Sequence, residues 1–298
     1  MAQVIAIVNQ KGGVGKTTVC RTLATMLSKY GKVLAIDFDP QETLSISLGA
    51  TKDKFDEESP SMYHVLAGEL HIEDAIINLN DFDIVRSDYR LYSYSGTPLI
   101  TKDIALEFKG QPEKMYNYIM ENIAKSENPK TDDRHKLSRE ISRIDNLYDY
   151  ILIDVNPNLG PLTILGLMAA PITNILIPAF PEESSRQAVI ALADTIETLL
   201  ANDFSQQINI LGILIAKYER NNISGKYLKF FSQLAENMDT ILFKTLIPKS
   251  VIVSEAIALK QSIFERRKSA PIIDKYNEFC DEFLQRLEYF KNNNCQAE

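Results

Sequence analysis

A short loop near the start of the chain holds the residues best suited to chemistry. Residues 9–18 read Asn-Gln-Lys-Gly-Gly-Val-Gly-Lys-Thr-Thr and follow directly on the apolar run 4–8. Glycines let consecutive backbone N–H groups curl around a polyphosphate, a lysine ammonium binds its β- and γ-phosphates, and a hydroxyl ligates Mg²⁺. The pattern predicts a phosphate-binding loop, with nucleotide contacts from Lys11, Gly12, Gly13, Val14, Gly15, Lys16, Thr17 and Thr18.

A second lysine, Lys11, stands at the head of the glycines, and Gln10 occupies a position where the common phosphate-loop pattern has glycine. One lysine inside the loop is enough to bind phosphate. The additional cation is therefore available to neutralise its own nucleotide or one held by a neighbouring subunit, where it stabilises transition-state charge as an arginine finger does. The alternative is a solvated loop lysine.

Carboxylates follow two further apolar runs. Residues 33–41 place Asp37 and Asp39 at the end of a predicted strand, and residues 148–154 form an apolar run that ends in Asp154. Carboxylates at i and i+2 leave a strand end on the same side, where one can hold Mg²⁺ through water and the other can position a nucleophilic water. Taken alone, the first pair is more typical of a solvated strand end, so its weight comes from following the loop.

The elements needed to position these residues can be read from periodicity. Residues 4–8, 175–178 and 210–215 are short, apolar and β-branched, as buried strands are, whereas residues 17–28 repeat apolar side chains at helical spacing. The alternation of strands and helices predicts one α/β domain over residues 1–298, built on a doubly wound, mostly parallel sheet flanked by helices.

Three of these segments resemble motifs of the ParA/MinD family of P-loop ATPases. Residues 11–17 resemble its deviant Walker A motif, residues 33–41 its Asp-x-Asp-Pro-Gln turn, and residues 148–154 its Walker B strand. The resemblance implies ATP and Mg²⁺ as cofactors. It further implies that Lys11 acts on the partner's ATP across a dimer interface and that Lys16 holds the β- and γ-phosphates. Asp39 then orients the attacking water, and the metal-holding residues are Thr17, Asp39 and Asp154.

The resemblance continues through most of residues 2–280. Residues 155–163 resemble the family's switch segment, but Asn156 replaces its first proline and Asn158 its serine. Residues 246–256 resemble a segment whose proline, here Pro248, lies against the adenine. Lys249 keeps a positive charge that the family has there, whereas Ile252 replaces a second arginine.

The middle of the chain departs from the family pattern. Residues 103–146 are longer than the usual helix-and-loop connection, and we interpret them as an insertion. Its composition predicts a helix over 113–124, an exposed loop, and a helix over 137–144. It is either a tolerated surface insertion, since long loops cost little stability, or a specificity element for a partner or nucleotide.

Charge is distributed unevenly. The formal net charge is -8, yet residues 213–268 carry ten Lys or Arg and five Asp or Glu, a local excess of five positive charges. Such a cluster is either a solvated basic face or the electrostatic footprint of nucleic-acid binding. The family resemblance favours the second, and the predicted DNA contacts are Arg220, Lys249, Arg266, Arg267 and Lys268.

Other features concern the compartment. The start is not typical of a signal peptide, because the apolar run 4–8 is short, and no apolar stretch reaches membrane-spanning length. Cys20, Cys280 and Cys295 lack metal-type spacing, which favours a reducing cytoplasm. The three histidines are scattered, and we predict surface or loop positions for His64, His71 and His135.

The resemblance therefore implies a ParA-type ATPase that dimerises with Mg-ATP and binds double-stranded DNA nonspecifically. Slow hydrolysis, stimulated by a ParB-like or other adaptor, positions a plasmid, chromosome or other cargo in the cytoplasm, on the nucleoid. The alternative is a MinD-like regulator on a membrane surface. It is disfavoured because residues 274–290 form an amphipathic helix whose polar face is acidic, whereas a membrane-targeting helix is basic there. We expect no membrane partner.

Overall fold

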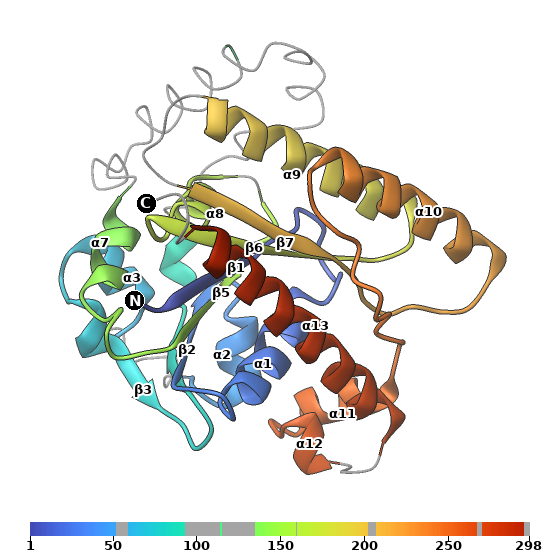
Figure 1. The fold of residues 1–298 in the computed structure, drawn as a ribbon. Helices are drawn as coiled ribbons and strands as arrows, with labels where there is room; N and C mark the ends of the chain where they lie inside the picture. The colour runs from blue at the N-terminus through green and yellow to red at the C-terminus, as the bar shows by residue number, and fades with distance from the viewer. Residues whose placement is uncertain are drawn as a thin grey trace.

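The structure is a computed structural model, and it describes residues 1–51, 59–92, 114, 135–158, 160–201, 207–266 and 270–294. Its centre is a seven-stranded sheet in the order β3-β4-β2-β5-β1-β6-β7, in which only the β3–β4 pair is antiparallel (Figure 1). The mostly parallel α/β fold predicted from the sequence is confirmed. The strands are β1 Gln3–Ile7, β2 Val33–Phe38, β3 Ile76–Asn78, β4 Asp83–Val85, β5 Tyr150–Val155, β6 Ile172–Ala179 and β7 Gln207–Ile215.

The central strands are apolar at nearly every position because both faces of the sheet are covered. In β1, Ile5 and Ile7 belong to one hydrophobic core, while Val4 and Ala6 belong to the other. Successive side chains of a strand point to opposite faces, so a strand buried on both sides becomes a continuous apolar run. This is the reason that residues 4–8 read as a buried strand.

Helices pack on each face (Figure 1). The core with Ile5 and Ile7 includes residues of α1 Lys16–Leu27, α2 Thr43–Leu48, α11 Val251–Ala258, α12 Ile263–Arg266 and α13 Pro271–Asn294. The opposite core includes residues of α3 Met62–Ala67, α7 Lys136–Ser142, α8 Pro161–Leu167, α9 Glu183–Ala201 and α10 Asn222–Asn237. Two short 3₁₀ helices, η1 Ile72–Ala75 and η2 Tyr89–Leu91, complete the described elements.

The last part of the predicted insertion belongs to the packed structure. The helix predicted over 137–144 is present as α7, whose Leu137 and Ile141 are fully buried. The helix predicted over 113–124 lies outside the described residues. The assignment of 103–146 as an insertion within a single domain stays a prediction.

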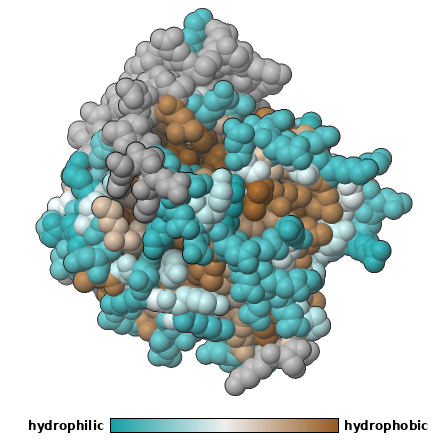
Figure 2. Space-filling view, viewed as in Figure 1, coloured by the Kyte–Doolittle hydropathy of each residue, from teal (hydrophilic) through white to brown (hydrophobic). Residues whose placement is uncertain are grey.

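Helix α13 docks as its periodicity predicts. The side of this helix that faces the sheet buries four aromatic or apolar residues, Tyr276, Phe279, Phe283 and Leu287. The surface over α13 is mostly hydrophilic (Figure 2), and most of its acidic residues face outward. Glu282 instead accepts hydrogen bonds from the backbone N–H groups of 244 and 245, at 2.8 and 3.0 Å. Among the described helices, none is both long and apolar enough to cross a membrane.

The surface prediction for the histidines was wrong for His64. This residue is only 7% exposed, and its Nδ1 lies 2.9 Å from the Ser61 hydroxyl. Helix α3 brings it inward together with its apolar neighbours Val65 and Leu66, which the spacing of a six-residue helix does not reveal. His71 and His135 are exposed, as predicted.

Candidate nucleotide-binding site

The glycine-rich loop lies at the carboxyl end of β1, between this strand and α1. Strand β1 pairs with β5 on one side and β6 on the other, at the centre of the sheet. In open parallel sheets the crevice beyond the carboxyl ends of the central strands is the usual ligand site. The fold therefore places residues 9–18 where a nucleotide is expected.

Two glycines take a backbone conformation that other residues rarely adopt. Gly13 has φ +79° and Gly15 has φ +100°, both in the left-handed region. Gly15 is also the N-cap of α1, and its carbonyl accepts a hydrogen bond from Val19 N–H at 2.8 Å. The first N–H groups of α1 are thereby turned toward the loop, which gives the positive end of a helix dipole to an anion.

Lys16 lies beneath this loop and is 7% exposed. Its Nζ donates to the backbone carbonyl of Lys11 at 3.4 Å. Burial lowers the pKa of Lys16, while the charges of Asp154 and Asp39 oppose that shift. A desolvated ammonium between carboxylates and a helix N-terminus is suited to bind phosphate oxygens, because little water remains to compete with them.

Asp154 is the penultimate residue of β5, where it pairs in register with Ile7 of β1 just before the loop, and it is 1% exposed. Neither of its carboxylate oxygens completes a hydrogen bond of normal geometry with a described residue. Burial raises its pKa to about 7, against the opposing effects of the Thr17 hydroxyl and the Lys16 ammonium. A buried carboxylate whose only neighbouring side-chain donors are Thr17 and Lys16 can still accept from a hydrated Mg²⁺, which proteins usually hold by one or two carboxylates together with phosphates and water.

The same edge carries Asp39, which is less buried than Asp154. Its Oδ1 accepts a hydrogen bond from Gln41 N–H at 3.0 Å, and burial raises its pKa. Lys16, Asp39 and Asp154 lie at one edge, since the charges of both aspartates act on Lys16, and the Thr17 hydroxyl acts on Asp154. A magnesium ion at this edge would be held by Thr17 and Asp154, and it would neutralise part of the charge of the phosphates.

Asp37 holds the strand end in place, whereas the spacing of the two carboxylates in the sequence did not separate its role from that of Asp39. It pairs in register with Asp154 across β2 and β5 and is fully buried. Its carboxylate accepts from Ser45 N–H at 2.8 Å and from the Ser45 hydroxyl at 2.6 Å. Burial and the charge of Asp154 raise its pKa to about 8. Asp37 also accepts from Asp39 N–H at 3.2 Å, so it fixes the turn that presents Asp39.

Lys11 lies at the open side of the loop. Its backbone N–H donates to Asn9 Oδ1 at 2.8 Å, and its Nζ lies 3.8 Å from Glu182 Oε1. The two side chains are 40% and 38% exposed. Ion pairs this exposed contribute little stability, so the Lys11 side chain is readily released toward another anion.

Lys217, at the end of β7, contacts the loop and was missed as a site residue. Its Nζ donates to the Gly13 carbonyl at 2.5 Å, from a backbone position with φ +54°. The adjacent Tyr218 donates its N–H to Ile247 O at 2.8 Å and forms an isolated bridge with Pro248. The segment containing Pro248 is therefore anchored beside Lys217, the residue that contacts the phosphate loop, although Pro248 and the loop lie far apart in sequence.

Two of the predicted DNA contacts are paired with acidic residues. Arg220 is exposed, but Lys249 Nζ lies 2.8 Å from Glu219 Oε1 and Arg266 Nη2 lies 3.3 Å from Glu255 Oε2. At these two positions a glutamate lies beside the cation, and both glutamates are already subtracted in the local excess of five positive charges. Residues Arg267 and Lys268 lie outside the described residues.

The switch-like segment uses Asn156 as a hydrogen-bond acceptor. Asn156 is 2% exposed, and its Oδ1 accepts from the Thr163 hydroxyl at 3.0 Å. The same hydroxyl contacts the carbonyl of Asn158. A proline at 156 has no side-chain acceptor, so the replacement adds a contact between this segment and α8.

Together, a helix-capping phosphate loop and a buried aspartate on the neighbouring strand define a P-loop ATPase. The AAA domain family model (AAA_31) matches residues 2–210. The chain is 28% identical to the chromosome-partitioning ATPase Soj of Thermus thermophilus, covering 95% of this chain and 96% of Soj. It is 30% identical to the chromosome partitioning protein ParA of Caulobacter vibrioides, covering 85% of this chain and 83% of ParA. The chain belongs to the ParA/MinD family of partition ATPases within this AAA domain family.

Solved structures show the same fold. Apo McdA from Cyanothece has a TM-score of 0.74 at 21% identity, covering 95% of this chain and all of McdA. An ATP complex of a McdA variant has a TM-score of 0.72 at 20% identity, covering 95% and 96% of the two chains.

The raised pKa of Asp154 predicts proton release when Mg²⁺ and nucleotide bind. Below about pH 7 the carboxyl of the free protein is largely protonated, and it must ionise to hold a cation. We expect about one proton released per site at pH 6 and little at pH 8.5, and loss of this pH-dependent release in Asp154→Asn. Calorimetry in buffers of different ionisation enthalpy measures it, with exposed Asp281→Asn as the control. Equal release by Asp154→Asn and wild type contradicts the assignment.

Proposed function

We propose that this ATPase is a nucleotide-gated dimer that binds DNA nonspecifically and positions a cargo. Mg-ATP joins two subunits, the dimer binds double-stranded DNA, and slow hydrolysis releases it. The observation that carries the proposal is Lys11, an exposed cation at the mouth of a phosphate loop that already contains the buried Lys16. The names of the relatives Soj and ParA, both of chromosome partitioning, support the cargo role.

Roles within the site follow from position and burial. Lys16 binds the β- and γ-phosphates, and Asp39 orients the attacking water. Thr17 and Asp154 would hold Mg²⁺, with help from Asp39. Pro248 packs against the adenine, since its segment is tied to the corner where Lys217 meets Gly13. Glycines 12, 13 and 15, with Val14 and Thr18, complete the cradle.

Lys11 supports dimerisation because its only side-chain partner among the described residues, Glu182, is exposed and replaceable. When two subunits face one another across their nucleotides, the ammonium can leave Glu182 for a phosphate of the partner's ATP. A charge-assisted contact with phosphate in a closed interface is stronger than an exposed ion pair.

We expect Lys11→Ala to bind ATP as a monomer. The intact loop and Lys16 still hold the nucleotide, but the interface loses the cation that offsets two facing triphosphates. Light scattering with ATP measures the mass, and calorimetry measures the affinity. Lys275→Ala, which breaks an exposed pair with Glu278 on α13, is the matched control and should dimerise as wild type does. An ATP-dependent dimer of Lys11→Ala refutes the role of Lys11 across the interface.

DNA binding is proposed for the surface with Arg220 and Lys249. Arg220 is exposed and lies two residues after Tyr218, which forms a bridge with Pro248. Lys249 is the next residue after Pro248, and its N–H donates to the Tyr218 carbonyl, so Arg220 and Lys249 lie near one another. Because Lys249 pairs with Glu219, Arg220 is expected to contribute more. Arg266, Arg267 and Lys268 are further candidate contacts with DNA, and the last two lie outside the described residues.

Arg220→Ala is expected to dimerise normally with ATP and to bind a random duplex weakly. Loss of one phosphate contact per subunit lowers the salt dependence of log affinity by roughly two in a dimer. Gel shifts at two salt concentrations measure both quantities. Lys249→Ala should have a smaller effect, since Glu219 already neutralises it. If Arg220→Ala keeps wild-type affinity and salt slope, the proposed face is wrong.

The proposed location is the cytoplasm, on the nucleoid, with a ParB-like or other adaptor as the activator of hydrolysis. The acidic outer residues of α13 do not favour a MinD-like role on membranes. ATP-dependent sedimentation with anionic liposomes, in the absence of binding to duplex DNA, is the result that reverses this choice.

A further inference from the structure

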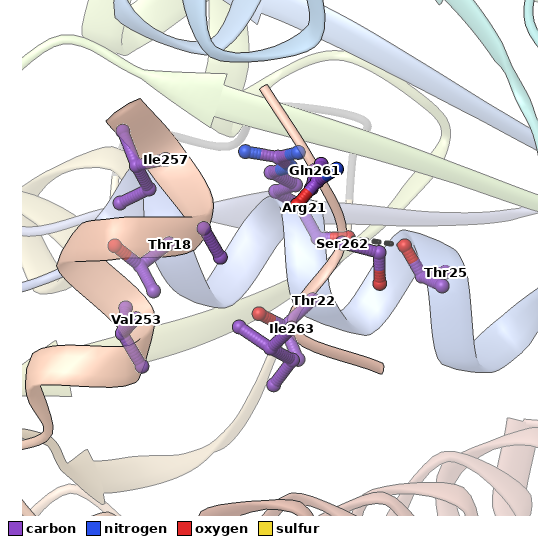
Figure 3. A pocket seen from close by; sticks show the side chains of 10 residues that line it. Thr18, Arg21, Thr22, Thr25, Val253, Ile257, Gln261, Ser262 and Ile263 are labelled. Carbon is purple, nitrogen blue, oxygen red and sulfur yellow. Dashed lines mark hydrogen bonds between the residues drawn. The ribbon is translucent and has the colours of Figure 1, made fainter. Parts of the chain in front are cut away.

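A second site is indicated on the other side of α1, where Arg21 is buried without a partner. Arg21 is 7% exposed, and its Nη1 is fully enclosed without a hydrogen bond. Within the described chain, no hydrogen bond or ion pair joins the guanidinium to another residue. In Figure 3 the guanidinium lies beside Gln261, with Thr18, Thr22 and Thr25 along the same helix and residues 261–263 opposite.

An unpartnered buried cation is costly. Burial lowers the pKa of Arg21, and the charge of Glu265 opposes this shift only in part. By contrast, Arg286 is half-buried and donates its Nε–H to the carbonyl of Leu211 at 3.0 Å. Enclosing Nη1 without a hydrogen bond costs stability, so Arg21 is better explained by a ligand that supplies an acceptor.

The space for such a ligand is present. A cleft of about 240 Å³, here called the Arg21 cleft, lies between α1, the β3–β4 turn and α12, and is lined among others by Arg21, Thr25, Asn80, Lys260 and Ser262. An enclosed cavity of about 10 Å³ adjoins it at Arg21, Thr25 and Ser262, with room for one water. None of residues 9–17 lines the Arg21 cleft, so it is separate from the phosphate loop.

We propose that the Arg21 cleft binds a small oxyanion, the phosphate or carboxylate group of a small molecule, with Arg21 as its ligand. A guanidinium is a planar fork of donors that matches two oxygens of such a group. Lys260 adds a second positive charge at the rim. The Ser262 hydroxyl accepts a hydrogen bond from Phe264 N–H, so its own proton is available to an anion there.

Acidic residues at the rim restrict the charge of the ligand. Asp81 and Glu265 line the same cleft, and Glu265 Oε2 accepts a hydrogen bond from Ser262 N–H at 3.0 Å. Two carboxylates close to the site repel a polyphosphate, while they accept hydrogen bonds from hydroxyl or amino groups. The ligand is therefore expected to combine one oxyanion with donor groups, unlike the triphosphate bound by the loop.

The test uses full-length protein saturated with ADP, so that the phosphate loop is occupied. Methyl-labelled protein is titrated with inorganic phosphate or with acetate at constant ionic strength set by chloride. The methyl resonances of Leu48, Leu79 and Ile263 report on the walls of the two cavities. We expect saturable shifts of these resonances with at least one probe, and the better probe identifies the oxyanion. At ten times Kd the melting temperature should rise by about 2 °C.

Arg21→Met keeps the apolar stem and removes the charge, and we expect it to abolish the saturable shifts. Without added anion this variant should melt no lower than wild type, because an unpaired buried charge has been removed. Arg143→Met, which removes an exposed arginine paired with Glu73, is the control and should keep the shifts. The proposal is overturned if neither probe gives saturable shifts, or if Arg21→Met gives the same shifts as wild type; in both cases one enclosed water is the better explanation of Arg21.

Discussion

Lys16→Ala is expected to abolish measurable ATP binding. The ammonium is 7% exposed, and its position at the N-terminal end of α1 gives it two phosphates to contact in a site with little competing water. Hydrogen bonds between charged groups contribute about 1.5–3 kcal/mol each, so the loss of contacts to two phosphates lowers affinity by roughly 100-fold or more. Isothermal calorimetry with ATP and Mg²⁺ measures this loss.

The same substitution has a second effect that can be separated from the first. In the wild type the Lys16 ammonium lowers the pKa of the buried Asp154 carboxyl. We therefore expect this pKa to be higher in Lys16→Ala than in the wild type. Lys275→Ala removes a lysine that pairs with Glu278 far from the loop and should bind ATP as wild type does. Undiminished affinity in a folded Lys16→Ala protein refutes the assignment of the phosphate site.

Local patterns in the sequence were sufficient for the phosphate loop and its strands. The loop is made by consecutive residues, and Gly13 and Gly15 can adopt a positive φ because they have no side chain. The strands β1, β5 and β6 are buried on both faces, so their apolar runs needed no information about their neighbours. The core side of α13 followed in the same way from helical periodicity.

Features that depend on distant residues could not be predicted in this way. The contact of Lys217 with Gly13 joins residues 204 positions apart, and its left-handed backbone has no sequence signature in a lysine. The division of labour between Asp37 and Asp39 depends on Ser45, which only α2 brings to the strand end. His64 is buried because α3 packs on the sheet, which its own short sequence does not specify.

For a related reason, charge counting does not identify individual DNA contacts. The excess of five positive charges in residues 213–268 is a property of composition, whereas DNA responds to cations that are free at the surface. In the structure Glu219 and Glu255 neutralise Lys249 and Arg266, and both acidic residues were part of the same count. The sequence therefore located a basic region, but not which of its residues are available to a phosphate backbone.

Asp39→Ala is expected to bind ATP and dimerise while hydrolysing ATP roughly 10²–10⁴ times more slowly than wild type. Lys16, Thr17 and Asp154 remain to hold Mg-ATP, but no carboxylate orients the attacking water. Asp39 is suited to that task because its Oδ1 is fixed by Gln41 N–H at 3.0 Å, and its backbone is fixed by Asp37 at 3.2 Å. Phosphate release under single-turnover conditions measures the rate, and light scattering confirms the dimer.

Asp39→Asn separates the charge of this residue from its structural contact. The amide oxygen of asparagine can still accept the hydrogen bond from Gln41 N–H, so the turn should keep its shape, yet the side chain can no longer act as an anionic acceptor for water. If the charge matters, Asn and Ala should be similarly slow, whereas exposed Asp281→Ala on α13 should hydrolyse at the wild-type rate. If Asp39→Asn hydrolyses as wild type and only Asp39→Ala is slow, Asp39 shapes the turn and the water must be oriented by another group.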